Sequence, residues 1–295
     1  MFTKLSPKTQ GILLVISSAF CFALMNALVR LSGELPTIQK CFFRNLIAIL
    51  FAALILWRER PTLKAERHNL PGLLLRSVCG TVGLICNYYA VDHMLLADAS
   101  ILNRLSPFVT VLLSWLFLKE TLTRTQAAAI VIAFLGALCI IRPGFGSLTT
   151  LPALIALLGG IGAGSAYATV RWLTGRGVNR AFIVFFFSCF SCLVMAPQAL
   201  LNYQPMRPSQ LLILLLAGLA AAGGQFSITY AYSKAPSRDI SVFDYTIVIF
   251  AGVLGFLLFG QVPDGLSLLG YLIIIGVSIF MFIANDNKKE ENHDK

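Results

Sequence analysis

The residues of this chain best suited to chemistry are charged side chains inside long apolar stretches. A charge near the centre of a bilayer costs at least ~2.5 kcal/mol, so each such residue needs a partner, a route to the surface or a function. Six basic residues are placed in this way: Arg30, Lys40, Arg44, Arg76, Arg104 and Arg171. Arg30, Lys40 and Arg171 lie near the ends of their stretches, where long side chains reach the lipid headgroups, which predicts a structural role. Arg44 lies roughly two turns inside its stretch and either pairs with a neighbouring helix or takes part in function.

Arg76 and Arg104 lie one to two turns inside their stretches, and each also lies on or beside a stripe of polar and small residues at helical spacing. The stripes of the third, fourth, sixth and eighth stretches are Arg76, Gly80, Gly83, Asn87; Ser100, Asn103, Pro107, Thr110, Ser114; Gly160, Gly164, Tyr167, Arg171; and Ala220, Gly223, Ser227, Tyr230. For the glycines alone, close helix packing is the leading interpretation. The polar side chains among them predict a lined cavity, in which the two arginines are joined by four further substrate-binding candidates: Asn87, Asn103, Tyr167 and Tyr230.

Three acidic residues accompany the apolar stretches. Asp98 and Asp239 each begin a stretch after a loop, so we expect them to cap helix N-termini. Asp244 lies five residues further in, at the repeat-equivalent of Asn103, so we expect these two residues to face each other across the pseudo-twofold axis. Asp244 is our candidate for substrate binding and for the group that couples or gates transport, with a fixed, orienting ion pair as the alternative. Counting Arg30 and Arg171, the candidate cavity helices carry four basic residues against these three acids. This slight excess favours a substrate with an anionic group.

These side chains belong to ten apolar stretches, each about as long as a helix that crosses a ~30 Å hydrocarbon core. The stretches run approximately over 11–31, 38–57, 71–91, 97–118, 125–142, 151–172, 180–200, 210–232, 238–260 and 265–284. Shifting the sequence by 141 positions places Val29-Arg30 on Val170-Arg171 and Tyr89-Ala90 on Tyr230-Ala231, without a gap. Five spans per copy is an odd number, so the second copy must cross the membrane inverted. The sequence predicts an all-α integral membrane fold of two inverted five-helix repeats around a central cavity.

Composition and charge agree with this fold class. At 57% hydrophobic and 12% charged residues, the chain is not a soluble protein. With the N-terminus inside, the inner segments carry fifteen Lys and Arg residues and the outer connectors carry two, which predicts that both termini are cytoplasmic. The net charge of +10 therefore orients the chain in a plasma (inner) membrane, and no nucleic-acid partner is expected. We expect a first repeat over 1–145, a second over 146–284 and a charged cytoplasmic tail over 285–295.

The two copies of the repeat resemble a known family. Leu105-Ser-Pro-Phe-Val-Thr and the residues up to Glu120 are similar to the fourth-helix signature of the EamA domain in the drug/metabolite transporter superfamily, and 243–261 is similar to its ninth-helix copy. The resemblance covers the whole chain and implies ten helices, six of which surround a cavity, and solute transport by alternating access. Val248 stands where the first copy has Pro107, which predicts that the copies do not bend alike. The first span offers Asn26 and no acid, which disfavours the drug/proton antiport of the related small multidrug-resistance proteins.

The sequence therefore favours a secondary transporter of a small polar or amphiphilic metabolite, such as an amino acid or a carboxylated metabolite. An integral-membrane enzyme is one alternative, although we find no catalytic cluster and every histidine lies in a loop or the tail. A channel or sensor is the other, although no filter segment or soluble output domain is evident. We expect no cofactor and no metal, with the bilayer and a small-molecule substrate as partners. A monomer is the simplest expectation, and a dimer is equally compatible with the sequence.

Overall fold

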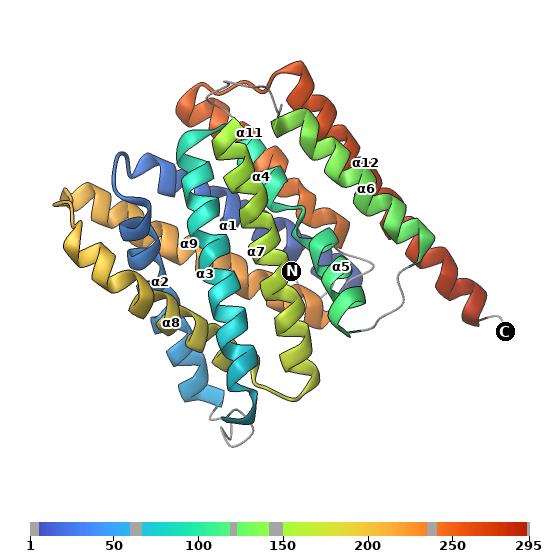
Figure 1. Cartoon of the computed structure of the whole chain (residues 1–295), viewed down its shortest axis with the longest axis horizontal. Helices are drawn as coiled ribbons and strands as arrows, with labels where there is room; N and C mark the ends of the chain where they lie inside the picture. The colour runs from blue at the N-terminus through green and yellow to red at the C-terminus, as the bar shows by residue number, and fades with distance from the viewer. Residues whose placement is uncertain (1–5, 60–66, 119–122, 142–149, 235–240, 294–295) are drawn as a thin grey trace.

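The computed structural model describes residues 6–59, 67–118, 123–141, 150–234 and 241–293, and within these ranges it contains helices and turns but no β-strand (Figure 1). Each of the ten apolar stretches forms one helix or a pair of successive helices. The elements are α1 (Pro7–Leu31), α2 (Thr37–Glu59), η3 (Arg67–Asn69), α3 (Leu70–His93), α4 (Leu96–Asn103), α5 (Ser106–Leu118), α6 (Arg124–Ile141), α7 (Thr150–Gly175), α8 (Arg180–Leu201), α9 (Pro208–Lys234), η4 (Ser241–Tyr245), α11 (Thr246–Phe259) and α12 (Gly265–His293).

Local sequence signals set several helix ends. The Ser6 hydroxyl accepts a hydrogen bond from the Thr9 amide at 3.2 Å, and proline follows directly, so α1 begins at Pro7. The Asn179 side chain caps α8 in the same way, with 3.1 Å to the Phe182 amide. Gly260 ends α11 in the left-handed conformation with φ of 63°, which glycine adopts without steric cost. These caps fix where α1 and α8 begin and where α11 ends.

Among the described residues, seven helical segments are long and apolar enough to cross a bilayer, one of which runs from α4 into α5 (Leu96–Leu113). Three shorter apolar segments accompany them: Arg124–Ile140, Phe243–Phe259 and Gly265–Met281. Together they form an all-helical integral membrane fold, as the composition predicts. The exposed surface is rich in large apolar side chains such as Leu50, Trp57 and Leu201, which suits contact with lipid tails.

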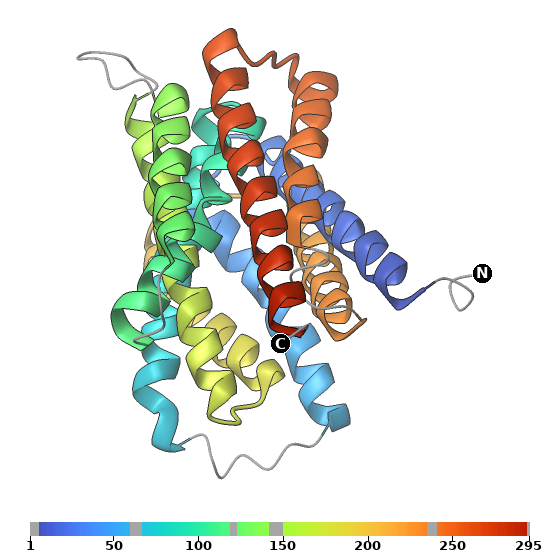
Figure 2. The ribbon, with the colours of Figure 1, turned by 90° about the vertical axis from the view of Figure 1, so that its right-hand side faces the viewer.

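The internal repeat recurs in the packing. A shift of 141 residues carries α5 onto α11 and α6 onto the first part of α12, with starting residues that agree to within one position. Contacts follow the same symmetry: α1 packs against α9 as α7 packs against α3, and α1 packs against α11 as α7 packs against α5. The remaining symmetric pairs, α2 with α8 and α6 with α12, lie at opposite edges of the bundle in Figure 1. Figure 2 faces the second of these edges and shows α12 and α6 in front.

We name the two ends of the bundle by the number of basic residues in their connecting segments. The charge-poor end carries the turns at 32–36, 94–95, 202–207 and 260–264, whereas the charge-rich end carries 58–59, 67–69 and 174–180. Successive long helices run between these two ends in alternating directions, because each short turn returns the chain to the bundle.

Glycines let the two repeats approach closely. A Cβ atom at Gly83 of α3 would lie 2.9 Å from the Ala163 backbone nitrogen of α7. A Cβ atom at Gly160 would lie 2.7 Å from the Leu102 carbonyl oxygen, and one at Gly164 would lie 2.6 Å from the Ser106 carbonyl oxygen. The glycine stripe of α7 therefore serves close packing against α3, α4 and α5, as the leading interpretation of those glycines predicts.

The fourth and ninth stretches are both interrupted, at positions that the repeat makes equivalent. α4 ends at Asn103 and α5 begins at Ser106, because Pro107 has no amide hydrogen for the carbonyl four residues earlier. In the second repeat the 3-10 turn η4 gives way to α11 at Thr246, whose hydroxyl donates to the Phe243 carbonyl at 2.7 Å. Where Val248 replaces Pro107, the 3-10 turn passes directly into α11 without the two-residue gap that separates α4 from α5, so the two copies differ at this point.

Candidate functional site

An ion pair joins the two interruptions across the repeat interface. Arg104 occupies the C-cap of α4, and its Nη1 donates to the Asp244 carboxylate in η4. The hydroxyl of Tyr245 donates to the Arg104 backbone carbonyl at 3.3 Å. The shift of 141 makes residue 104 equivalent to residue 245, so the two contacts connect matching break points. Such broken helices at a repeat interface are where secondary transporters place substrate and coupling groups.

The pair is reachable and incompletely satisfied. The side chains of Arg104 and Asp244 are 15% and 17% exposed, so neither is sealed in the core. The second carboxylate oxygen of Asp244, Oδ1, is buried and has no hydrogen-bond partner among the described residues. One oxygen of Asp244 thus holds Arg104, while the other is available to a proton or to a ligand donor.

The partner of Asp244 differs by one residue from the sequence expectation. Asp244 is the repeat-equivalent of Asn103, and we expected these two residues to face each other across the pseudo-twofold axis. Asn103 is the last residue of α4, half-buried, and the ion pair forms with the next residue, Arg104. The charged neighbour reaches the acid because the helix breaks at that point.

Helix α1 supplies the neighbouring wall. The Phe22 ring centre lies 6.0 Å from Cζ of Arg104, at the outer limit of a cation–π contact. Asn87 of α3 donates its amide to the Asn26 side chain of α1 at 3.3 Å, and Asn26 is buried. Asn87 therefore connects α3 to α1 through Asn26, the polar residue that the first span carries instead of an acid.

Arg76 lies elsewhere. Its guanidinium stacks on the Phe187 ring of α8, with 3.8 Å from Cζ to the ring centre, and no described ion pair or hydrogen bond links it to Arg104. Tyr167 of α7 interacts electrostatically with Arg76 and is 54% exposed. The structure thus separates the two arginines that the sequence grouped. The side chain of Tyr230, together with all of Asp239, lies outside the described residues.

Two expectations near the helix ends need correction. Lys40 does not extend to the headgroups: it is 1% exposed, and its Nζ donates to both Asp92 oxygens at 2.8 Å. Asp98 does not occupy the N-cap of α4, which is Leu95 and has no side-chain cap bond. Asp98 lies in the first turn and accepts a hydrogen bond of 2.5 Å from the Tyr271 hydroxyl. Sequence reasoning missed these bonds because each joins helices distant in the chain.

The charge-poor half of the interface is closed. The Leu96 amide at the start of α4 donates to the Gln261 side chain at 2.9 Å, and this contact bridges the two repeats. Leu96, Ile101 and Leu105 are fully buried. Because this half is packed, the partial exposure of the ion pair points to access from the charge-rich end.

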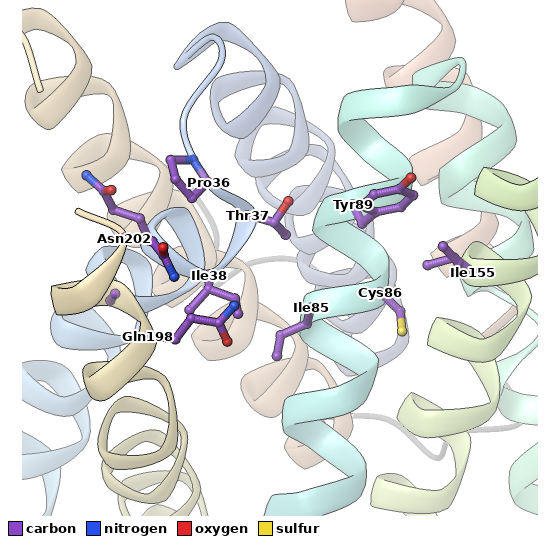
Figure 3. Close-up of a pocket in the computed structure, with 11 residues that line it drawn as sticks. Pro36, Thr37, Ile38, Ile85, Cys86, Tyr89, Ile155, Gln198 and Asn202 are labelled. Carbon is purple, nitrogen blue, oxygen red and sulfur yellow. The ribbon is translucent and has the colours of Figure 1, made fainter. Parts of the chain in front are cut away.

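A pocket of about 420 Å³ lies away from the ion pair, between α2, α3, α7 and α8 (Figure 3). Its wall is mainly apolar, and Gln198 and Asn202 of α8 contribute side-chain amides. Within the described ranges, no three His, Cys, Asp or Glu side chains gather closely enough to hold a metal ion.

Comparisons with known proteins agree with this geometry. The EamA-like transporter family matches residues 9–142 and again residues 150–283, two ranges that differ by the 141-residue shift. The pseudopaline exporter of Pseudomonas aeruginosa is 34% identical over 268 residues, which cover 90% of this chain and 93% of that protein. The riboflavin transporter of Rhizobium johnstonii is 27% identical over 287 residues and covers 95% of this chain and 93% of its own.

More distant similarities extend to the fold. Human solute carrier family 35 member G1 is 23% identical over 287 residues, covering 91% of this chain and 78% of that protein. A solved crystal structure superposes with a TM-score of 0.64 at 16% identity, over 90% of this chain and 95% of the other, which concerns the fold alone. Members of the matched family move small molecules across membranes and are not enzymes. The chain, with its two matched repeats, belongs to the EamA-like transporter family of the drug/metabolite transporter superfamily.

Proposed function

We propose that this transporter moves a small metabolite bearing a carboxylate group, such as an amino acid, out of the cell by alternating access. The observation that carries the proposal is the Arg104–Asp244 pair, which lies at the matched breaks of both repeats and is partly exposed. A planar guanidinium binds carboxylates with two parallel hydrogen bonds. Export is favoured because the relative at 34% identity is named as an exporter.

Substrate would bind by exchange. A substrate carboxylate that reaches Arg104 competes with Asp244 for the same donors. Asp244, once released, is a carboxylate without a counter-charge at a site that is mostly shielded from water, and taking up a proton removes that energetic cost. Its unpartnered Oδ1 offers a position for the proton. Substrate binding and protonation are linked in this cycle, so substrate and proton leave the cell together. A high internal substrate concentration drives export, and a pH gradient imposed with the acidic side inside accelerates it.

The proposal includes ten crossings with both termini cytoplasmic, in the plasma membrane. The charge-rich end then faces the cytoplasm, in agreement with the positive-inside rule. Since the charge-poor half of the interface is closed, the described conformation corresponds to an inward-facing state. Residues 1–145 and 146–284 act as the two repeats that move against each other, and the bundle functions as a monomer.

Transport assays in proteoliposomes test this proposal. Purified protein is first screened by thermal shift against a metabolite library in which each acid is paired with its methyl ester or amide. Acids should stabilise the protein and their neutral partners should not, and the best acid should show saturable counterflow. Arg104→Gln should abolish both effects, whereas Arg176→Gln, on the exposed surface, should change neither. Equal stabilisation by acids and esters, or counterflow that survives Arg104→Gln, would refute the carboxylate proposal.

A further inference from the structure

Two other arginines inside the bundle lack a counter-charge. Arg44 lies on α2 and Arg76 on α3, and both helices pack against α8. The two guanidinium groups are close enough to interact electrostatically. The described ion pairs are formed by other residues, so neither arginine has a carboxylate partner within the described ranges. Two like charges in a poorly hydrated region repel each other, and a positive charge left there without a partner is strongly unfavourable.

Donor atoms in this cluster are unused. Nε of Arg44 and both Nε and Nη1 of Arg76 are buried without a hydrogen-bond partner among the described residues. Nη1 of Arg44 donates to the neutral amide oxygen of the adjacent Asn45 at 2.8 Å, and the neutral Tyr88 side chain of α3 lies beside the same guanidinium. The hydroxyls of Ser77 and Ser188, on α3 and α8, are likewise buried and unpartnered. Buried donors of this kind are ordinarily satisfied, so several unused donors on three helices that pack together indicate a missing acceptor.

Packing fixes the Arg76 guanidinium in place. It stacks on Phe187, and Gly80 provides the space that it occupies. A Cβ atom at residue 80 would lie 2.6 Å from Nη1 of Arg76 and 2.9 Å from the Phe187 ring. The guanidinium is therefore held against one face of an aromatic ring, with its edge free to donate.

The described acids on these three helices are otherwise engaged. Asp92 of α3 already accepts two bonds from Lys40. Glu59 of α2 is exposed at the charge-rich end and accepts a bond from Asn179 at 3.2 Å. It lies 15 residues from Arg44, about 22 Å along the helix axis at ~1.5 Å per residue. Neither acid serves as the counter-ion of the two arginines.

We propose that Arg44 and Arg76 form a second anion-binding site between α2, α3 and α8, which holds one small monovalent anion, either a halide ion or the carboxylate of an organic acid. The site is separate from Arg104 and Asp244 and does not depend on the proposed transport cycle. Ser77 follows Arg76 in the sequence and Ser188 follows Phe187, and the hydroxyls of both serines are neutral donors. Gly80 and the Phe187 ring confine the Arg76 guanidinium, so a small anion fits beside it better than a bulky one.

The pocket in Figure 3 lies on the same helices, nearer the charge-poor end. Ile38 of α2 and Ile85 and Cys86 of α3 face its interior. Ile38 lies six residues before Arg44, about 9 Å along the helix. The pocket therefore offers an apolar approach to the arginines from that end, and an organic acid can place its apolar part there.

Direct binding to the purified full-length protein tests the site. Radiolabelled chloride and radiolabelled acetate are the two probes, measured by scintillation proximity at constant ionic strength with gluconate as the balancing anion. We expect saturable binding of about one anion per chain, displaced by bromide and nitrate. Displacement of chloride by acetate, and by any transported acid, identifies the site as one for organic carboxylates. Selective binding of halides identifies it as an inorganic-anion site, and both outcomes support the proposal. No saturable binding of either probe would overturn it.

Variants assign the binding to these residues. Arg44→Gln and Arg76→Gln should each weaken binding about tenfold or more, the effect of losing a charge-assisted hydrogen bond. Arg176→Gln is the matched control, because Arg176 also stacks on an aromatic ring, 4.0 Å above Trp172, but lies on the exposed surface. Gly80→Ala retains both arginines and favours the helix, yet it displaces the Arg76 guanidinium and should weaken binding as well. Unchanged affinity in Arg44→Gln and Gly80→Ala together would assign the anion to another part of the protein.

Discussion

Replacing Asp244 by asparagine should uncouple transport from protons while keeping the site folded. Asparagine has the shape of aspartate and still offers Arg104 a carbonyl oxygen, but it has no titratable group. If Asp244 takes up the proton that drives the cycle, Asp244→Asn should abolish substrate accumulation driven by a pH gradient. Exchange of labelled for unlabelled substrate should continue, because exchange requires binding and alternation but no net proton movement.

The stability effect of the same substitution can be bracketed from the burial of the pair. Breaking an exposed ion pair costs ~0–1 kcal/mol, whereas removing one partner of a buried pair costs ~3–5 kcal/mol. The two side chains are 15% and 17% exposed, which places this pair nearer the buried limit. Because asparagine still offers Arg104 a carbonyl oxygen, the loss should be below that limit, and we expect Asp244→Asn to lower the free energy of unfolding by about 2 kcal/mol, equivalent to a fall in Tm of roughly 4–8 °C.

Both effects are measured on the same purified protein, with Tm by fluorescence-detected thermal unfolding in detergent and transport in proteoliposomes. Asp92→Asn is the control, because Asp92 belongs to the other described ion pair, with Lys40, and should change stability without changing the pH response. A double-mutant cycle with Arg104→Gln should give a coupling energy of at least about 1 kcal/mol. Normal pH-dependent accumulation by Asp244→Asn would refute the coupling role, and a coupling energy near zero would refute the ion pair.

Three further predictions concern packing, the buried lysine and topology. Gly164→Ala should destabilise the bundle by about 2 kcal/mol in detergent, because its Cβ would lie 2.6 Å from the Ser106 carbonyl oxygen at the start of α5. Gly223→Ala should be tolerated, because the nearest neighbour of its Cβ would lie at 3.5 Å. Equal Tm values for the two variants would argue against the close contact at Gly164. Asp92→Asn should lower the free energy of unfolding by about 3 kcal/mol, measured by thermal unfolding, because it leaves the charge of Lys40 without a partner at 1% exposure. Replacing both residues by apolar ones should restore most of the loss. A reporter fused after Asp264 should indicate the outside and one at the C-terminus the inside; the reverse pattern would overturn the charge-based orientation.

Apolar length, the 141-residue repeat and the placement of charge were enough to predict the fold class, because each is a property of one segment or of the whole chain. Most described helix ends lie within four residues of the predicted apolar stretches, whereas α12 continues to His293, nine residues past the predicted end at 284. The depth of Asp244 and its relation to the break near Asn103 also followed from the repeat, which relates matched positions without any knowledge of side-chain contacts.

The partners of the charged residues were decided by the tertiary structure. Arg76 and Arg104 carry equal weight in the sequence, yet one stacks on Phe187 and the other bonds Asp244, because rotation of each helix about its axis selects the neighbour. That rotation is set by contacts between distant helices, such as Gly83 with α7, which no local pattern encodes. For the same reason Lys40, which the sequence places near a headgroup, is buried against an aspartate 52 residues away.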